Sequence, residues 1–173
     1  MTDTAAKPPR SFDLPPAMRA LVLAAGGTMT ALSLFAIGKV VLGVVPRYYI
    51  LKEAAILIHL ATVIPALPLG LYLLLARKGT ATHKALGKLW LALMVTTALA
   101  ALFIRTLNHG QFSFIHIFVP LTLIGAWRVI HTARTGKISA HRRQILSLYL
   151  GALIIPGIFA MLPTRLMGAW LFG

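Results

Sequence analysis

The chain contains no cysteine among its 173 residues. Disulfide bonds, iron–sulfur clusters held by cysteine and haem attached through a C-x-x-C-H motif are therefore excluded. Any metal or haem would have to be held by other side chains, and the six histidines are the first candidates.

Acidic residues are almost as scarce, because Asp3, Asp13 and Glu53 are the only three. A carboxylate pair for acid–base catalysis and a carboxylate proton relay are therefore both excluded inside a membrane. Glu53 stands directly before an apolar segment, where it could support a ligand or simply face the membrane surface. The sequence also contains no phosphate-binding loop, zinc-ligand spacing or nucleophile triad.

Basic residues are plentiful: seventeen Lys and Arg side chains give a formal net charge of +14. They fall at the ends of apolar segments and do not form one patch. This distribution is typical of membrane topology and of attraction to anionic lipids, and it argues against a nucleic-acid partner.

Apolar sequence dominates the chain, at 58% hydrophobic residues and a mean hydropathy of +0.84. A soluble domain of this length could not bury so much apolar surface, so the lipid bilayer must be its solvent. We predict a disordered cytoplasmic tail over residues 1–19 and one transmembrane domain over residues 20–173. Five apolar segments of roughly 20 residues should each be a helix, because a backbone in lipid must satisfy its own hydrogen bonds. The predicted all-α, polytopic fold has helices at about 20–45, 54–76, 85–107, 112–130 and 145–162.

The basic residues also predict an orientation. Twelve of the seventeen lie in the tail or near the second-to-third and fourth-to-fifth connections. The positive-inside rule then predicts a cytoplasmic N-terminus and a periplasmic C-terminus in a bacterial inner membrane.

Two matched pairs of histidines reveal an internal repeat. His59 and His116 each follow an isoleucine and precede an apolar run ending in Ala-Arg-x-Gly, with a constant displacement of 57 residues. His83 and His141 form a second pair, displaced by 58 residues. The repeat is parallel, with halves at about 54–107 and 112–162, and it predicts a four-helix bundle with the first helix outside the repeat.

The pair His59 and His116 is expected at equal depth on two helices, near the outer boundary of the membrane. Two imidazoles in this arrangement could hold a b-type haem or a metal ion between them. The alternative is that they hydrogen-bond across helices as packing contacts, or line a small polar cavity.

The remaining candidates lie nearer the ends of the predicted helices. His83 and His141 are expected just before their helices begin, where they could hold a second haem or belong to basic loops that bind lipid headgroups. Arg105 and Arg165, at the outer ends of the third and fifth helices, could bind haem propionates or an anionic substrate.

Several stretches resemble a known bacterial membrane family. They are Ala76-Arg77-Lys78-Gly79 with His83-Lys84-Ala85-Leu86-Gly87-Lys88-Leu89-Trp90, Phe112 to His116, Ala133 to Arg143, and Gly151 to Met167. The first is similar to the HR-x-LG-R-x-[YW] signature of the family catalogued as domain of unknown function 2306. The likeness covers about residues 54–173, with Lys84 where Arg is usual and Thr164 where Gly is usual. It implies membership of a membrane family and no particular reaction.

A second resemblance concerns architecture alone. Transmembrane dihaem cytochromes b of the ascorbate-reducing type carry one histidine on each of four consecutive helices, and alternate helices share a haem. The pairs His59/His116 and His83/His141 look like that arrangement, except that His83 and His141 are expected at helix entrances.

Three hypotheses about function follow. The first is a haem-dependent membrane protein that moves electrons between a quinol or other small reductant and an acceptor. The second is a small-molecule transporter or channel, with a histidine-lined cavity among proline-containing helices. The third is a non-catalytic lipid-binding or assembly subunit, acting as a homo-oligomer or within a larger complex.

Overall fold

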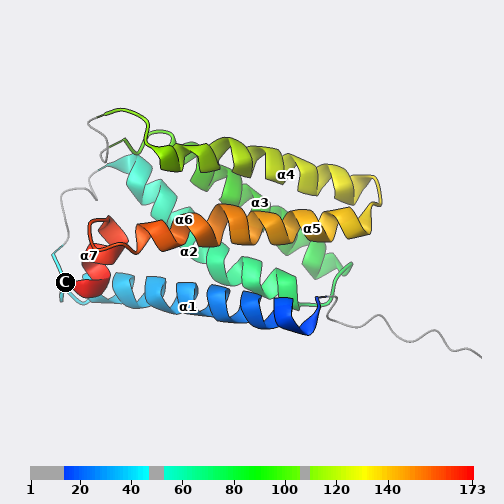
Figure 1. Ribbon diagram of the computed structural model, residues 1–173, viewed down its shortest axis with the longest axis horizontal. Coiled ribbons are helices and arrows are strands. Elements are labelled where there is room, and N and C mark those ends of the chain that lie inside the picture. The colour runs from blue at the N-terminus through cyan, green and yellow to red at the C-terminus, as the bar shows by residue number, and fades with distance from the viewer. Residues whose placement is uncertain (1–13, 47–52, 106–109) are drawn as a thin grey trace, which may run out of the picture.

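The computed structural model describes residues 14–46, 53–105 and 110–173. Within these ranges every regular element is a helix and no strand is present, which confirms the predicted all-α class. Figure 1 shows the arrangement. The elements are α1 (Pro16–Val41), α2 (Ala54–Leu75), α3 (Ala81–Ala101), η3 (Phe114–Ile117), α4 (Phe118–Arg134), α5 (Ile138–Tyr149), η4 (Leu150–Ile154), α6 (Ile155–Ala160) and α7 (Leu166–Phe172).

Five helical segments in the described residues are long and apolar enough to cross a membrane. They are α1, α2, α3, the continuous helix formed by η3 and α4, and the continuous helix formed by α5, η4 and α6. The prediction of five spans is confirmed, and the chain is a multi-pass membrane protein.

Two helix starts within the bundle differ from the prediction. The third and fifth spans begin at Ala81 and Ile138, earlier than expected, so His83 and His141 lie inside helices rather than before them. The hydroxyl of Thr80 explains the first case, because it accepts the backbone N–H of His83 at 3.0 Å and so caps α3. Polar residues lower the hydropathy of a segment without ending a helix. A prediction from apolar runs therefore places the starts of α3 and α5 too late.

The helices near the two ends of the chain also differ from the prediction. Helix α1 begins at Pro16, inside the segment predicted as a tail, and residues 1–13 of that segment lie outside the described residues. The short helix α7 near the C-terminus was not predicted, because seven residues are too few to register as a span.

The spans α2, α3, α4 and α5 form the predicted four-helix bundle. In this ring α2 packs on α3, α3 on α4 and α4 on α5, while α5 closes against α2 through few contacts. Helices α2 and α4 are therefore diagonal partners, as are α3 and α5. Helix α1 packs outside the ring on α2 and α7, as Figure 1 shows.

The bundle has two ends. Helices α1, α3 and α5 begin at one end, which we call the amino-terminal end, and α2 and α4 begin at the other, the carboxy-terminal end, where α7 also lies (Figure 1). Each histidine pair thus belongs to one end, with His59 and His116 at the carboxy-terminal end and His83 and His141 at the amino-terminal end.

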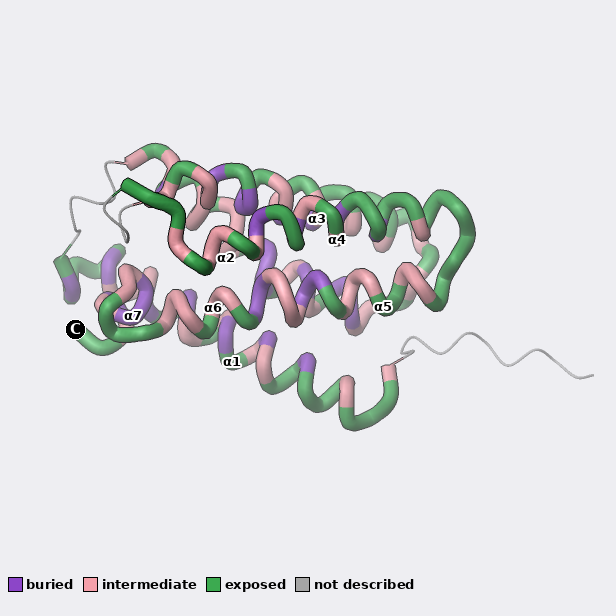
Figure 2. Tube along the Cα trace, turned by 45° about the horizontal axis from the view of Figure 1, so that its top comes forward, coloured by how far each residue is buried: buried purple, intermediate pink, exposed green. Residues whose placement is uncertain are grey.

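Buried residues lie mainly on the faces that point into the bundle (Figure 2). Many large apolar side chains are exposed on the outside. Phe35, Phe103 and Trp127 are each at least 60% exposed, as expected for side chains solvated by lipid. The most buried large side chains, Trp90 and Tyr149, meet in the middle of the molecule.

These two aromatic residues bind the backbone of α2. Trp90 Nε1 donates to the carbonyl of Ala66 at 3.0 Å, and the Tyr149 hydroxyl donates to the carbonyl of Leu67 at 3.2 Å. They approach this closely because Gly70 has no side chain: a Cβ there would lie 2.7 Å from Trp90 Nε1 and from the Tyr149 ring. Together these contacts fix α3 and α5 against α2.

Candidate functional site

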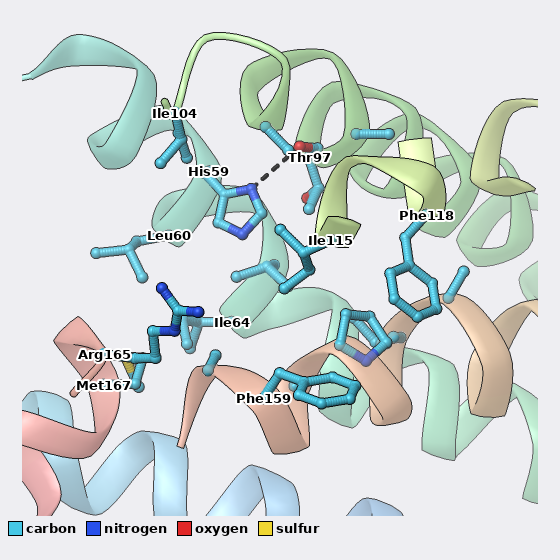
Figure 3. A pocket seen from close by; sticks show the side chains of 18 of the residues that line it. His59, Leu60, Ile64, Thr97, Ile104, Ile115, Phe118, Phe159, Arg165 and Met167 are labelled. Carbon is cyan, nitrogen blue, oxygen red and sulfur yellow. Dashed lines mark hydrogen bonds between the residues drawn. The ribbon is translucent and has the colours of Figure 1, made fainter. Parts of the chain in front are cut away.

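A cavity of about 310 Å³ lies in the carboxy-terminal half of the bundle. Its lining is mainly apolar and includes residues from all five spans. Three side chains with ionisable groups reach it from three different elements: His59 from α2, His116 from η3 and Arg165 from the residue before α7. Figure 3 shows His59 and Arg165 pointing toward the same space. The structure therefore brings together one predicted histidine pair and one predicted arginine.

The ring of His59 is oriented by a backbone carbonyl. Its Nδ1 lies 3.1 Å from the carbonyl oxygen of Thr97 on α3. A carbonyl can only accept, so Nδ1 carries the proton and Nε2 keeps its lone pair. His59 thus offers the cavity a hydrogen-bond acceptor or a metal-ligating nitrogen.

Two threonines reinforce this orientation. The hydroxyl of Thr97 donates to the hydroxyl of Thr62 at 2.7 Å, and Thr62 donates to the carbonyl of Ile58 at 2.8 Å. The chain of bonds joins α3 to α2 at the level of His59. Both hydroxyls are thereby satisfied inside an apolar layer, where an unmade hydrogen bond is costly.

Replacement of Thr97 by valine should destabilise the folded protein by about 1 kcal/mol, since hydrogen bonds between transmembrane helices contribute about 0.6–1.7 kcal/mol. Thr96→Val is the matched control, because Thr96 lies on the same helix with an exposed side chain. Equilibrium unfolding in mixed detergent micelles measures both variants. Equal stability of the two would show that the Thr97–Thr62 bond contributes nothing.

His116 has the opposite hydrogen-bonding pattern. It forms a capping box with Ser113, in which the backbone N–H of Ser113 donates to Nδ1 at 3.0 Å. Nδ1 also lies 3.1 Å from the carbonyl oxygen of Ser113, but the N–H of Ser113 can only donate and it points at Nδ1, so we assign the proton of the neutral ring to Nε2. That atom is buried and has no hydrogen-bond partner among the described residues, so His116 offers the cavity an unsatisfied donor.

The two predicted arginines occupy different places. Arg165 lines the cavity, while Arg105 is not among the lining residues. The Nε of Arg105 donates to the carbonyl of Leu102 at 3.1 Å, and its guanidinium lies 4.2 Å from the centre of the Phe112 ring. Arg105 thus packs against the chain beside η3 through a cation–π contact.

A widened helical turn shapes one wall of the cavity. The segment η4, Leu150–Ile154, is a π-helix between α5 and α6, and Pro156 is the second residue of α6. Proline has no N–H to donate, and its ring cannot pack against the carbonyl four residues earlier in an α-helix. The π turn accommodates this conflict, and Ala152, Leu153, Pro156 and Gly157 line the cavity as a result.

Helix α1 contributes two lining residues that the sequence analysis did not single out. Met29 and Ser33 face the cavity, and Ser33 is only 2% exposed. The buried positions on α1, which are Val22, Gly26, Met29, Ser33, Ala36 and Val40, recur every three or four residues. One face of α1 therefore packs on protein rather than on lipid, but only the structure reveals it, because apolar residues surround α1 evenly and its sequence has no amphipathic pattern.

The second histidine pair lies at the opposite end of the bundle. His83 and His141 line a cavity of about 30 Å³ with Lys78 and Arg142. Such a volume holds one or two water-sized groups, so a porphyrin would fit only if α3 and α5 moved apart. His141 Nδ1 donates to the carbonyl of Val129 at 3.0 Å, whereas His83 Nδ1 is buried without a partner among the described residues.

Metal binding by protein side chains alone has little support. The described residues contain no group of three or more His, Asp or Glu side chains that could hold a metal ion. Glu53 precedes α2 at its N-cap position and makes no side-chain capping bond there. An ion at His59 and His116 would need further ligands from elsewhere.

The comparison with known proteins agrees with this architecture. A family model described as "Predicted membrane protein (DUF2306)" matches residues 56–170, which include nearly all of α2 and most of α7. No curated protein and no solved structure matches the chain. The matched region contains both histidine pairs, the α2–α3 and α4–α5 connections, and Arg165. Helix α1 precedes it. The chain therefore belongs to the membrane-protein family DUF2306.

Proposed function

We propose that this membrane protein binds a small, mainly apolar molecule with oxygen substituents, of the quinone or quinol class, in the cavity that all five spans line. The observation that carries the proposal is the convergence of His59, His116 and Arg165 on one apolar cavity. A binding site of this kind typically has apolar walls and a few polar groups that fix the orientation of the ligand.

The hydrogen-bonding pattern supports an oxygen-bearing ligand. His116 Nε2–H and the guanidinium of Arg165 can donate to a carbonyl or phenolate oxygen, and His59 Nε2 can accept from a hydroxyl. A quinone offers carbonyl acceptors, and a quinol offers hydroxyls that both donate and accept. The ligand would also satisfy the buried donor of His116.

The size of the cavity supports a ring smaller than a porphyrin. Small-molecule sites span about 300–1,000 Å³, and about 310 Å³ is at the lower end of that range. A single substituted ring fits this volume, and an isoprenoid or alkyl tail would extend into the surrounding lipid.

Titration of the purified protein with a short-chain benzoquinone tests the proposal. Binding should raise the unfolding free energy by about 2.7 kcal/mol at a ligand concentration one hundred times Kd. His59→Leu and His116→Leu should each weaken binding about tenfold or more, because each removes a hydrogen bond in an apolar site. His131→Leu is the matched control, since His131 is exposed near the end of α4 and stacks on Trp127. Wild-type affinity in both cavity variants would contradict the proposal.

Haem b is a second candidate, favoured by one observation. His59 and His141 each donate Nδ1–H to a backbone carbonyl, as histidines that ligate metals commonly do. The fit is partial, because His116 accepts a hydrogen bond at Nδ1 and would have to exchange its protonated nitrogen before it could ligate iron. A haem held here would supply one-electron redox chemistry, and His59 is the residue that would hold it.

A reduced-minus-oxidised visible spectrum separates the two candidates. Protein purified from haem-replete cells should show no Soret or α band if the quinone proposal is correct. Sharp bands that disappear in His59→Leu and persist in His131→Leu would establish haem at this site instead.

A further inference from the structure

Arg165 places a permanent positive charge at the ligand cavity. It lies directly before α7, lines the cavity and points toward the same space as His59 (Figure 3). A guanidinium stays protonated in proteins, so this charge does not depend on the surroundings. The other lining residues are mainly apolar, and the only ionisable ones among them are His59 and His116. A cation therefore faces a largely apolar space.

The short helix α7 fixes the backbone from which this side chain projects. The N–H of Arg165 donates to the carbonyl of Leu162 at 2.8 Å, and its carbonyl accepts from the N–H of Ala169 at 2.7 Å. Gly168 packs directly on the backbone of Leu162, so that a Cβ there would have no room. Trp170 is buried in a cluster with residues of α1. The guanidinium is thus held beside the cavity before a ligand arrives, which lowers the entropy lost on binding.

No carboxylate offsets the charge of Arg165 within the described part of the chain. Glu53 is the only acidic side chain there. It precedes α2 at the same end of the bundle, but it does not line the cavity and forms no ion pair with Arg165. Lys39, in the last turn of α1, and Arg105 add two further cations at this end. The described side chains at the carboxy-terminal end therefore have a net positive charge, which attracts an anion.

The hydrogen-bonding groups of the cavity also favour negative charge on the ligand. The guanidinium of Arg165 offers several N–H donors, and His116 Nε2–H is a buried donor without a partner among the described residues. His59 Nε2 is the one acceptor on these three side chains. A neutral quinone carbonyl can accept such bonds, but it leaves the charge of Arg165 unbalanced. Hydrogen bonds to an ionised oxygen are shorter and roughly twice as strong.

We propose that the cavity binds its ligand as an anion, with the negatively charged oxygen held by Arg165 and His116. This assignment rests on the proposed function, and it narrows the quinone class to members that carry an acidic hydroxyl group on the ring. Such a hydroxyl is conjugated with a ring carbonyl, so it is ionised at neutral pH. The ionised oxygen lies next to a second ring carbonyl, and the two oxygens together match the paired N–H groups of a guanidinium.

Two matched benzoquinones test this inference on the wild-type protein. Both have the same short alkyl chain, but one has a hydroxyl group beside a ring carbonyl and the other has a methoxy group, which has no proton to lose. Equilibrium dialysis of the full chain in an uncharged detergent, with empty micelles as the blank, measures both affinities. The titration is done at about pH 8, above the usual range in which histidine is protonated. We expect the hydroxyquinone to bind about tenfold more tightly than the methoxyquinone.

Substitutions of Arg165 assign this preference to one side chain. Arg165→Gln should weaken binding of the hydroxyquinone about tenfold more than binding of the methoxyquinone. Arg165→Lys should keep part of the preference, because it retains the charge without the paired N–H groups. Arg105→Gln is the matched control, since it removes the same charge at the same end from a side chain that does not line the cavity. It should retain the preference to within about threefold, because charges outside the cavity are screened.

The possible outcomes separate this inference from the proposed function. Equal affinity of the wild-type protein for both quinones would overturn the anion preference and leave the quinone site in place. Equal loss of preference in Arg165→Gln and Arg105→Gln would also overturn it, because general attraction by the basic end of the bundle would then suffice. Binding of neither quinone would overturn the proposed function together with this inference. The wild-type comparison decides between these outcomes even if Arg165→Gln fails to fold.

Discussion

Gly70→Ala should destabilise the folded protein by about 2–3 kcal/mol, the cost of overpacking a tightly packed core. The added Cβ would lie 2.7 Å from Trp90 Nε1 and 2.7 Å from two carbons of the Tyr149 ring. Neither side chain can move aside freely, because Trp90 is 1% and Tyr149 0% exposed. Displacing them would also weaken their hydrogen bonds to the carbonyls of Ala66 and Leu67.

Thermal unfolding in mild detergent measures this effect, and the midpoint should fall by roughly 5–10 °C. Gly87→Ala is the matched control, since Gly87 is also a helical glycine and a Cβ there would meet nothing within 4 Å. The control should be neutral or stabilising by up to about 1 kcal/mol, because alanine favours the helix over glycine. If both variants unfold at the wild-type temperature, the contact of Trp90 and Tyr149 over Gly70 does not hold the three helices together.

Ala101→Phe should abolish ligand binding, with an affinity loss of about 100-fold or more. Ala101 is the last residue of α3 and lines the cavity, so a phenyl ring there would occupy the space proposed for the ligand. The polar groups of His59, His116 and Arg165 stay unchanged in this variant. A loss of affinity in this variant would show that the ligand needs the volume of the cavity, whereas the histidine variants measure the contribution of the hydrogen bonds.

The short-chain benzoquinone titration used for the histidine variants measures this loss. Ala92→Phe provides the control, because Ala92 is an exposed residue on the same helix. It should bind as tightly as the wild type. Both variants should remain folded, since Ala101→Phe fills empty volume and Ala92→Phe adds its ring on the exposed face of α3. Unimpaired binding by Ala101→Phe would place the ligand outside the cavity.

The repeat in the sequence predicted which histidines lie at the same end of the bundle, but not which ring nitrogens carry protons. A constant displacement predicted that His59 and His116 share one end of the bundle and that His83 and His141 share the other, and the structure places them so. The displacement could not assign their protons. Those follow from the carbonyl of Thr97 beside His59 and the N–H of Ser113 beside His116, which differ although the repeat is shared.

The sequence by itself determined the fold class, the number of spans and the family. In lipid each backbone segment must satisfy its own hydrogen bonds, so apolar runs become helices whatever their neighbours are. The helix count can therefore be read from linear hydropathy, and the family from local motifs such as His83 to Trp90.

The tertiary structure alone decided the composition of the candidate sites. Arg105 and Arg165 were both predicted at the outer ends of helices. In the structure Arg165 lines the cavity, whereas Arg105 stacks on Phe112. Ser33 joins the cavity because α1 packs across α2 and α7, and the π turn at Leu150–Ile154 opens one wall. Such contacts depend on how helices cross and rotate against one another. Packing between side chains that are distant in the sequence sets the crossing angles of the helices, so these angles cannot be predicted from hydropathy along the chain.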